Sequence, residues 1–346
     1  MRFSKIAGVS VLALMAGLTS GTAHASLSLR QAFQDAALSI DGFGGDSGTI
    51  SADIPAGSVV QKAYLYGASV WDASFGSTTF QGTTFTAAQG TLLAPNVNPA
   101  STYLFDVTSI VKPIVDSGSG GIYNFSISDI AADGEVLVVV YKNASTVGGT
   151  AIIMDGELAT TGDSATLTFS SPYTGGQAVM SLASSFSYNG GTAQNATGQV
   201  TRVDVSTSSN PSPRRLTSCA GGNDDGNFAN ANGTLITVGG VGDSTANPNP
   251  NCQGGAGDDE LYDLSQGNSA DSNPFLVPGD TSLTLTTVNP TNDDNVFGLF
   301  FTSTFRVSSV NNEDIENPPT TVPEPGTLTL LGAGLAGLAL ARRRRS

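Results

Sequence analysis

Residues 135–141 read Glu-Val-Leu-Val-Val-Val-Tyr, and this stretch decides the expected fold. Five consecutive aliphatic residues run from Val136 to Val140 without a polar residue between them. Valine favours extended backbone, and a strand without polar alternation is typical of a position covered on both faces. The stretch therefore predicts a buried strand with other layers on either side.

Other stretches along the chain also have the composition of strands separated by turns. Forty-two glycines, with many Thr, Ser, Asn and Asp residues, supply the turns, and no long helical periodicity is present. Pairs such as Asp133-Gly134 are typical of hairpin turns. We therefore predict an all-β fold, an antiparallel β-sandwich of jelly-roll-like type with long polar loops. The other expected strands span residues 58–68, 123–127, 151–154, 166–169, 179–186, 200–205, 283–288 and 296–307.

One short helix is expected over residues 106–111, ahead of Pro113, with Asp106 or Thr108 as its cap. The body spans residues 26–310, with a candidate sub-boundary near residue 210. A polar stretch from 210 to 273 is either a linker or an insertion. Strongly predicted strands follow this stretch, and they need other strands of the body to bury them, which favours the insertion. Acidic residues and prolines over 311–321 indicate a flexible linker.

The amino-terminal residues have the features of a secretory signal peptide. Arg2 and Lys5 form a basic region, an apolar stretch follows, and Ala23 and Ala25 flank a small-x-small cleavage site before Ser26. We predict that signal peptidase removes residues 1–25.

The carboxyl-terminal residues 322–346 combine three features. Pro323, Glu324 and Pro325 precede sixteen mostly apolar or small residues over 326–341, and four arginines follow, Arg342, Arg343, Arg344 and Arg345. As a helix this stretch would span about 24 Å, short of a hydrocarbon core of about 30 Å. The arginines would stay on the cytoplasmic side. An ordinary tail anchor and a transient inner-membrane anchor both fit the span alone.

The Pro-Glu-Pro triplet, the short span and the arginine cluster together resemble the PEP-CTERM sorting signal of Gram-negative, exopolysaccharide-producing bacteria. The resemblance covers about 25 residues. It implies a single transmembrane helix over 326–341 and processing near the triplet by exosortase, a membrane protease. It also implies delivery of the body to the cell surface or extracellular matrix, with extracellular polysaccharide as a partner.

Removal of both ends restricts the chemistry of the body. His24 is the single histidine, so the body has no imidazole for Ser-His-Asp or Cys-His catalysis or for histidine-ligated zinc. The ends hold six of the 14 basic residues and one of the 29 acidic residues, which leaves a net charge of −20. Such a body repels nucleic acid and anionic lipid and attracts divalent cations or basic partners.

Two cysteines, Cys219 and Cys252, lie in the polar stretch. In an exported chain an even pair is typical of a disulfide, which we predict here; two free thiols are the alternative.

Acidic clusters surround these cysteines and precede the last strong strand. Calcium takes six to eight oxygen ligands from carboxylates and carbonyls. The spacing matches neither an EF-hand nor an RTX repeat, so solvated turn carboxylates are the alternative to a structural Ca²⁺. The candidate ligands are Asp224, Asp225, Asp258, Asp259, Glu260, Asp293 and Asp294.

A glycoside hydrolase needs only two carboxylates, so the pairs Asp259–Glu260 and Asp155–Glu157 qualify by residue type. Adjacent carboxylates on a strand point to opposite faces, however, and exposed loop carboxylates seldom have a raised pKa. We therefore expect a non-enzymatic structural or adhesive protein linked to exopolysaccharide or biofilm. A carbohydrate-binding module is the first alternative and the hydrolase the second.

Overall fold

The computed structural model describes residues 27–70, 73–93, 100–156, 162–185, 201–220, 236–251, 259–289 and 295–316. These residues form four sheets, and every described strand pair is antiparallel. The predicted all-β class is confirmed.

Two sheets come from the first half of the chain. Sheet I has the order β3 (Ser47–Ile54), β9 (Gly121–Ile130), β5 (Ser77–Phe80) and β6 (Thr83–Thr86). Sheet II has the order β2 (Ala37–Phe43), β10 (Ala132–Lys142), β4 (Val59–Ser69), β8 (Thr102–Asp106) and β7 (Thr91–Leu92).

The other two sheets combine the first strand with strands from residue 150 onward. Sheet III has the order β1 (Ser28–Gln34), β11 (Thr150–Asp155), β19 (Asn295–Ser303), β13 (Ala178–Ser185) and β16 (Ile236–Val238), and β17 (Leu261–Asp263) also pairs with β13. Sheet IV has the order β15 (Arg214–Ala220), β14 (Thr201–Thr207), β18 (Ser282–Val288), β12 (Asp163–Phe169), β20 (Val307–Val310) and β21 (Glu313–Asp314).

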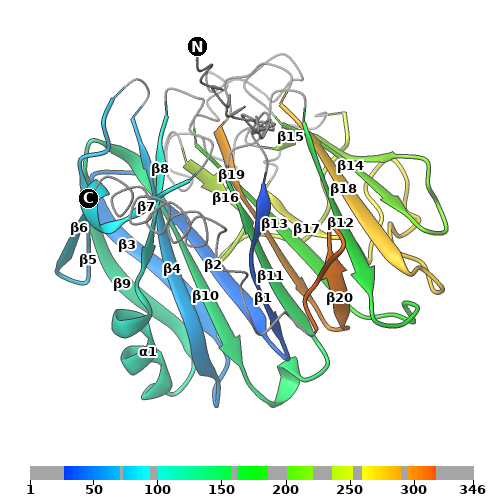
Figure 1. The fold of residues 1–346 in the computed structure, drawn as a ribbon, viewed down its shortest axis with the longest axis horizontal. Coiled ribbons are helices and arrows are strands. Elements are labelled where there is room, and N and C mark those ends of the chain that lie inside the picture. The colour runs from blue at the N-terminus through cyan, green and yellow to red at the C-terminus, as the bar shows by residue number, and fades with distance from the viewer. Residues whose placement is uncertain are drawn as a thin grey trace, which may run out of the picture.

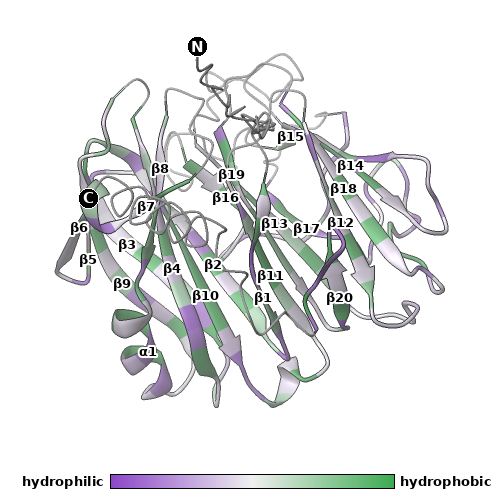
Figure 2. Ribbon diagram, in the orientation of Figure 1, coloured by the Kyte–Doolittle hydropathy of each residue, from purple (hydrophilic) through white to green (hydrophobic). Residues whose placement is uncertain are grey.

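The four sheets stack in the order I, II, III, IV, from left to right in Figure 1. Three separate apolar cores join successive sheets. Because sheets II and III are covered on both sides, their central strands are buried along nearly their whole length. The outer strands instead alternate, as in β14 and β18, and Figure 2 shows their mixed hydropathy.

The 135–141 stretch lies within β10, at the centre of the molecule, and the prediction of burial on both faces is confirmed. Val136, Val138 and Val140 contribute to the core between sheets II and III. Leu137 and Val139 contribute to the core between sheets I and II.

The predicted hairpin turn at Asp133-Gly134 is wrong. Both residues lie inside β10, where the register with β4 shifts between Ala132 and Gly134. A β-bulge accommodates the extra residue, and Gly134 takes a φ of 150°, which glycine adopts without strain. The chain turns two residues before Asp133, at Ala131, whose φ is 56°.

The predicted helix is present as α1 (Thr108–Asp116), but it continues through Pro113 instead of ending before it. Pro113 lacks the N–H that would bond to the Ser109 carbonyl, and both residues are exposed, so water can satisfy that carbonyl. The Asp106 carboxylate accepts a hydrogen bond from the Thr108 N–H at 3.0 Å. Val111 and Val115 pack against sheet II.

Neither predicted boundary separates structural units in the described residues. The candidate sub-boundary near residue 210 lies in the turn between β14 and β15, which pair in one sheet. Residues 311–316, assigned to the linker from sequence, pack on the body: β21 pairs with β20, and Ile315 is buried. The described parts of the 210–273 stretch supply β15 to sheet IV and β16 and β17 to sheet III.

Candidate functional site

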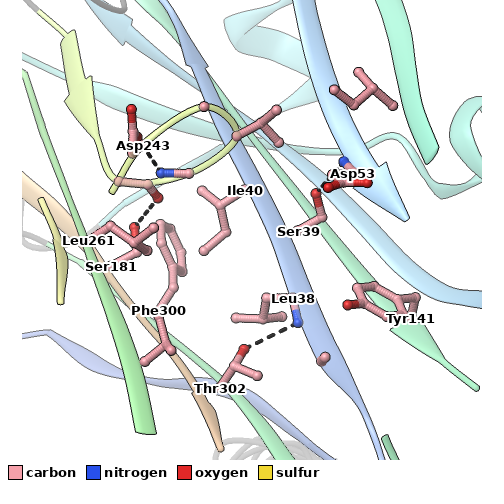
Figure 3. A pocket seen from close by; sticks show the side chains of 17 residues that line it. Leu38, Ser39, Ile40, Asp53, Tyr141, Ser181, Asp243, Leu261, Phe300 and Thr302 are labelled. Carbon is pink, nitrogen blue, oxygen red and sulfur yellow. Dashed lines mark hydrogen bonds between the residues drawn. The ribbon is translucent and has the colours of Figure 1, made fainter. Parts of the chain in front are cut away.

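A groove of about 420 Å³ lies where the edge of sheet II meets sheet III (Figure 3). Strands β2, β3, β9 and β10 form one side, and β13, β17, β19 and residues 239–243 form the other. The lining residues are Ala37, Leu38, Ser39, Ile40, Asp53, Ile122, Tyr141, Val179, Ser181, Gly239, Gly240, Val241, Gly242, Asp243, Leu261, Phe300 and Thr302.

The segment 239–243 is held on the edge of β2 by backbone contacts. The Val241 N–H donates to the Ile40 carbonyl at 2.9 Å, and the Ser181 hydroxyl donates to the Gly239 carbonyl at 2.6 Å. A Cβ atom at Gly240 would lie 2.1 Å from the Ile40 carbonyl oxygen. The Gly239-Gly240 pair is therefore what lets this segment approach the strand closely enough to line the groove.

The groove combines an apolar surface with a polar region. Leu38 donates its N–H to the Thr302 hydroxyl at 3.2 Å, and the Asp53 N–H donates to the Ser39 hydroxyl at 2.8 Å. Burial raises the pKa of Tyr141, and the Asp53 carboxylate raises it further. An aromatic ring beside an exposed carboxylate can bind a hydroxyl-rich or cationic ligand.

The hydrolase candidate Asp155 is a buried structural carboxylate. Its Oδ2 accepts hydrogen bonds from the Arg30 guanidinium and, at 2.9 Å, from the Tyr66 hydroxyl. Burial raises the pKa of Asp155, and Arg30 and Tyr66 act against that rise. Its predicted partner Glu157 lies outside the described residues.

Among the predicted calcium ligands, the structure describes only Asp259 and Glu260. Asp259 accepts a hydrogen bond from the Ser244 N–H at 2.9 Å, whereas Glu260 is fully buried with a φ of 49°. Asp224, Asp225, Asp258, Asp293 and Asp294 lie outside the described residues. In the described part of the chain, no three His, Cys, Asp or Glu side chains form a group that could hold a metal ion.

The predicted disulfide stays a prediction. Cys219 lies in β15, while Cys252 lies outside the described residues.

Sequence reasoning missed a second group of acidic residues, Asp129, Asp133 and Glu135, between sheets I and II. Glu135 is fully buried, and Asp133 is 8% exposed. Burial is the largest cause that raises the pKa of Asp129 to about 6, of Asp133 to about 7 and of Glu135 to about 8. The signal was present in the sequence. Asp129 continues the inward alternation of Phe125 and Ile127, and Glu135 opens the apolar stretch.

The ends of the chain carry the remaining predicted sites. Residues 321–345 match the family model of the PEP-CTERM protein-sorting motif. The chain carries a PEP-CTERM sorting motif. The motif supports a secreted protein that exosortase-type machinery processes. No curated protein matches the chain.

The PEP-CTERM match includes Pro323, Glu324, Pro325 and Arg342 to Arg345, all outside the described residues. Ala23, Ala25 and Ser26 also lie outside them, so the signal-peptide cleavage site stays a prediction. Helices in the described part of the chain are too short or too polar to cross a membrane, and the predicted span over 326–341 is not part of it.

Proposed function

We propose that this chain is the precursor of a non-enzymatic structural or adhesive protein of the cell surface or extracellular matrix. Signal peptidase removes its amino-terminal peptide, an exosortase-type protease processes its carboxyl-terminal signal, and the released body associates with extracellular polysaccharide. The observation that carries this proposal is the PEP-CTERM motif at residues 321–345.

The body has properties that suit this role. Both central sheets are covered on each face by apolar cores. Among the described residues, the exposed large apolar side chains are few and come from several different elements. Such a surface limits self-association, and the net charge of −20 expected for the processed body keeps it soluble. A soluble, layered body is a suitable cargo for export into a hydrated matrix.

The sorting step can be tested in the native host with Pro323, Glu324 and Pro325 all changed to Ala. We expect wild-type protein in the surface or matrix fraction without its arginine tail, and the variant in the inner membrane with the tail intact. An Ala substitution at Asn317, Pro318 and Pro319, which precede the match, is the matched control and should not alter processing. Identical fractionation and mass for wild type and triplet variant would overturn the proposal.

The biofilm role needs a separate readout. Deletion of the gene should change matrix or floc formation, and complementation with the wild-type gene should restore it. Unaltered biofilm in the deletion strain would contradict a structural role even if sorting proceeds as proposed.

Carbohydrate binding is the second candidate, and the groove beside Tyr141 and Asp53 favours it. Retention of the body on matrix polysaccharide should fall at least tenfold in Tyr141→Ala and in Asp53→Asn if this groove binds glycan. Tyr103→Ala, at a half-buried tyrosine outside the groove, is the control. Equal retention of all three variants would exclude glycan binding at this groove.

We do not propose hydrolysis as the function, because Asp155 is already bound to Arg30 and Tyr66 inside the molecule. The expected result is no release of reducing ends from matrix polysaccharide. Release by wild-type body that is lost in Asp259→Asn would revive the hydrolase alternative.

A further inference from the structure

Three acidic side chains, from Asp129, Asp133 and Glu135, meet where the chain passes from sheet I to sheet II. Asp129 lies near the end of β9, and the other two lie at the start of β10. None of the three lines the groove, and none belongs to the sorting motif. We refer to these three residues below as the buried acid group.

Strand alternation directs two of these side chains into the core between sheets I and II. Asp129 follows Ile127 by two residues, and Glu135 precedes Leu137 by two. Ile127 and Leu137 belong to that core, and alternate residues of a strand share a face. Thr78 of β5 lies directly opposite Asp129, and its hydroxyl is a hydrogen-bond partner of Glu135. Side chains of the two sheets therefore touch at this position.

A bulge brings Asp133 to the same place. It is the extra residue of β10 between Ala132 and Gly134, where the register with β4 shifts. Bulges commonly redirect a side chain, and here the charge of Asp129 acts on Asp133. The charge of Asp129 acts on Glu135 as well. The three acids are therefore electrostatically linked across two sheets.

The buried acid group has little access to water and few partners. Glu135 is 0% exposed, and Asp133 is 8% exposed. The Asp129 Oδ2 and the Asp133 Oδ2 are buried and form no hydrogen bond with a described residue. A buried carboxylate of this kind is costly, whereas a neutral carboxyl costs far less and carries an O–H donor of its own.

Basic side chains are placed elsewhere in the body. The body holds eight of the 14 Lys and Arg residues, and all eight lie in the described part of the chain. Six of them form ion pairs with other carboxylates. Lys142 lies at the opposite end of β10, beside Val59, and Arg202 lies in sheet IV. The buried acid group therefore has no counter-ion among the described residues.

The strands around the group add only acidic or uncharged side chains. The neighbours of Glu135 on either side of β10 are Gly67 and Phe43. Asp46, just before β3, accepts a hydrogen bond from the Asp129 N–H through its backbone carbonyl at 3.0 Å, and its side-chain charge also acts on Asp129. Ionisation of the group is therefore opposed by burial and by like charge together.

We propose that Asp129, Asp133 and Glu135 form a pH-sensitive latch, which holds the β5–β9 corner of sheet I on β10 while they are neutral and releases it when they ionise. Burial is the largest cause that raises the pKa of Asp129 to about 6, of Asp133 to about 7 and of Glu135 to about 8. Loss of these protons places like charges in one buried space, and their repulsion and hydration open the corner. The latch belongs to the folded body and does not depend on how the body is sorted.

The sign of the pH dependence follows from the raised pKa values. A carboxyl whose pKa is raised by folding gives stability that is fully present below the unfolded pKa of about 4. That stability is lost as pH rises through the folded pKa. The contribution of the latch should therefore disappear between about pH 6 and about pH 8.

The first test is urea denaturation of the protein purified from the native host, from about pH 5 to about pH 9. Because the pKa of Glu135 alone is raised from 4.5 to about 8, the equilibrium constant for unfolding should rise at least about a hundredfold over this range. Glu135→Gln stays neutral and should lose at least about tenfold of that rise. Glu313→Gln, in the exposed β21, is the matched control and should keep the full rise.

Asp133→Asn serves in the same comparison if Glu135→Gln does not fold. An unfolding constant that does not change with pH in wild type would overturn the proposal. An equal rise in wild type and in the variant of the buried acid group would overturn it as well.

The second test locates the opening by hydrogen exchange. Protection factors, corrected for the intrinsic effect of pH on exchange, should fall at least about tenfold in β5 and β9 between about pH 6 and about pH 9, and should change less in β12 and β18 of sheet IV. In Glu135→Gln the fall in β5 and β9 should be smaller. Equal loss of protection in sheets I and IV would show that ionisation weakens the whole body instead of releasing one corner, and would overturn the proposal.

Discussion

At the scale of single residues, the stability of the body depends on the ion pair between the partly exposed Arg30 and the buried Asp155. Arg30 lies at the register shift of β1 and pairs with Asp155 at the end of the neighbouring strand β11, and the Tyr66 hydroxyl from sheet II also donates to Asp155. The charge of Asp155 is tolerated only because both partners reach it.

Removal of one partner should therefore cost far more than a surface ion pair does. Arg30→Met should lower the free energy of unfolding by about 3–5 kcal/mol, because Asp155 would stay buried without its counter-ion. The control is Lys62→Met, whose partner Asp106 is 50% exposed and which should cost less than about 1 kcal/mol. Urea denaturation of both variants gives the comparison, and equal losses would contradict the role of burial.

Asp280 provides a pH-dependent contribution. Burial acts to raise its pKa, but the N–H groups of Val277 and Ser209 donate to its carboxylate at 2.8 Å and 2.9 Å, and the net effect lowers the pKa. A lowered pKa in the folded state gives stability that is present above the unfolded pKa of about 4 and is lost as pH falls through the folded pKa.

We therefore expect Asp280→Ala to destabilise the body by about 2 kcal/mol at pH 7 and by progressively less below pH 4. Denaturation midpoints measured from pH 7 to pH 2.5 give this difference. A difference between wild type and variant that stays constant over that range would show that the carboxylate charge is not the source of the stability.

At the scale of elements, β10 illustrates how much a local pattern can specify. Its apolar run contains no polar break, and the strand lies between two apolar cores. Val138 and Val139 face opposite cores, so Ala substitution at either position should cost about 2 kcal/mol.

The burial of both faces of β10 can be checked against β9, which belongs to the outer sheet I and has one exposed face. There Ile127→Ala should destabilise strongly, whereas Ser126→Ala, at an exposed position, should be within about 0.5 kcal/mol of wild type. Chemical denaturation of the four variants tests the layer order. A nearly neutral Val138→Ala or Val139→Ala would mean that one face of β10 is open.

The β10 bulge is the element that sequence reasoning mistook for a turn. At Gly134, φ is 150° and a Cβ atom would lie 2.3 Å from the Phe43 carbonyl oxygen. Gly134→Ala should therefore destabilise by more than about 3 kcal/mol. Gly45→Ala, where the nearest atom would lie at 3.5 Å, should be tolerated. The melting temperatures of both variants test this prediction, and similar melting temperatures for the two would contradict the bulge at Gly134.

The same elements show what the sequence could and could not predict. Apolar periodicity identified β10, β11, β13, β18 and β19, because their own residues report their burial. The dipeptide Asp133-Gly134 has the composition of a hairpin turn, and only the pairing with β4 makes it a bulge. Pro113 suggested a helix end, yet the affected carbonyl lies on an exposed surface where water is available.

Sites were less predictable than strands for a physical reason. Contiguous acidic runs are conspicuous in a sequence, and the run at Asp258, Asp259 and Glu260 led to the calcium prediction there. The carboxylates of Asp129 and Glu135 are separate along the chain, and they meet only because β9 and β10 lie in facing sheets. The groove likewise depends on how β2 approaches residues 239–243, which no local pattern encodes.

At the scale of the whole molecule, the chain consists of a body followed by its sorting signal. The body is a stack of four sheets in which β1 pairs with β11, so the beginning of the described chain is tied to a strand more than 100 residues away in sequence. Residues 311–316 end the described body against sheet IV, next to the residues that lead to the PEP-CTERM motif. Residues 317–320 alone separate the last described residue of the body from the matched motif.

We propose that the body reaches the cell surface or matrix after removal of this signal. The most direct measurement is the intact mass of the protein recovered from the surface and matrix fractions of the native host. We predict a mature chain that begins at Ser26, ends close to Pro323-Glu324-Pro325 and lacks Arg342 to Arg345. A recovered protein that retains the four arginines, or one found only in the inner membrane, would contradict the account.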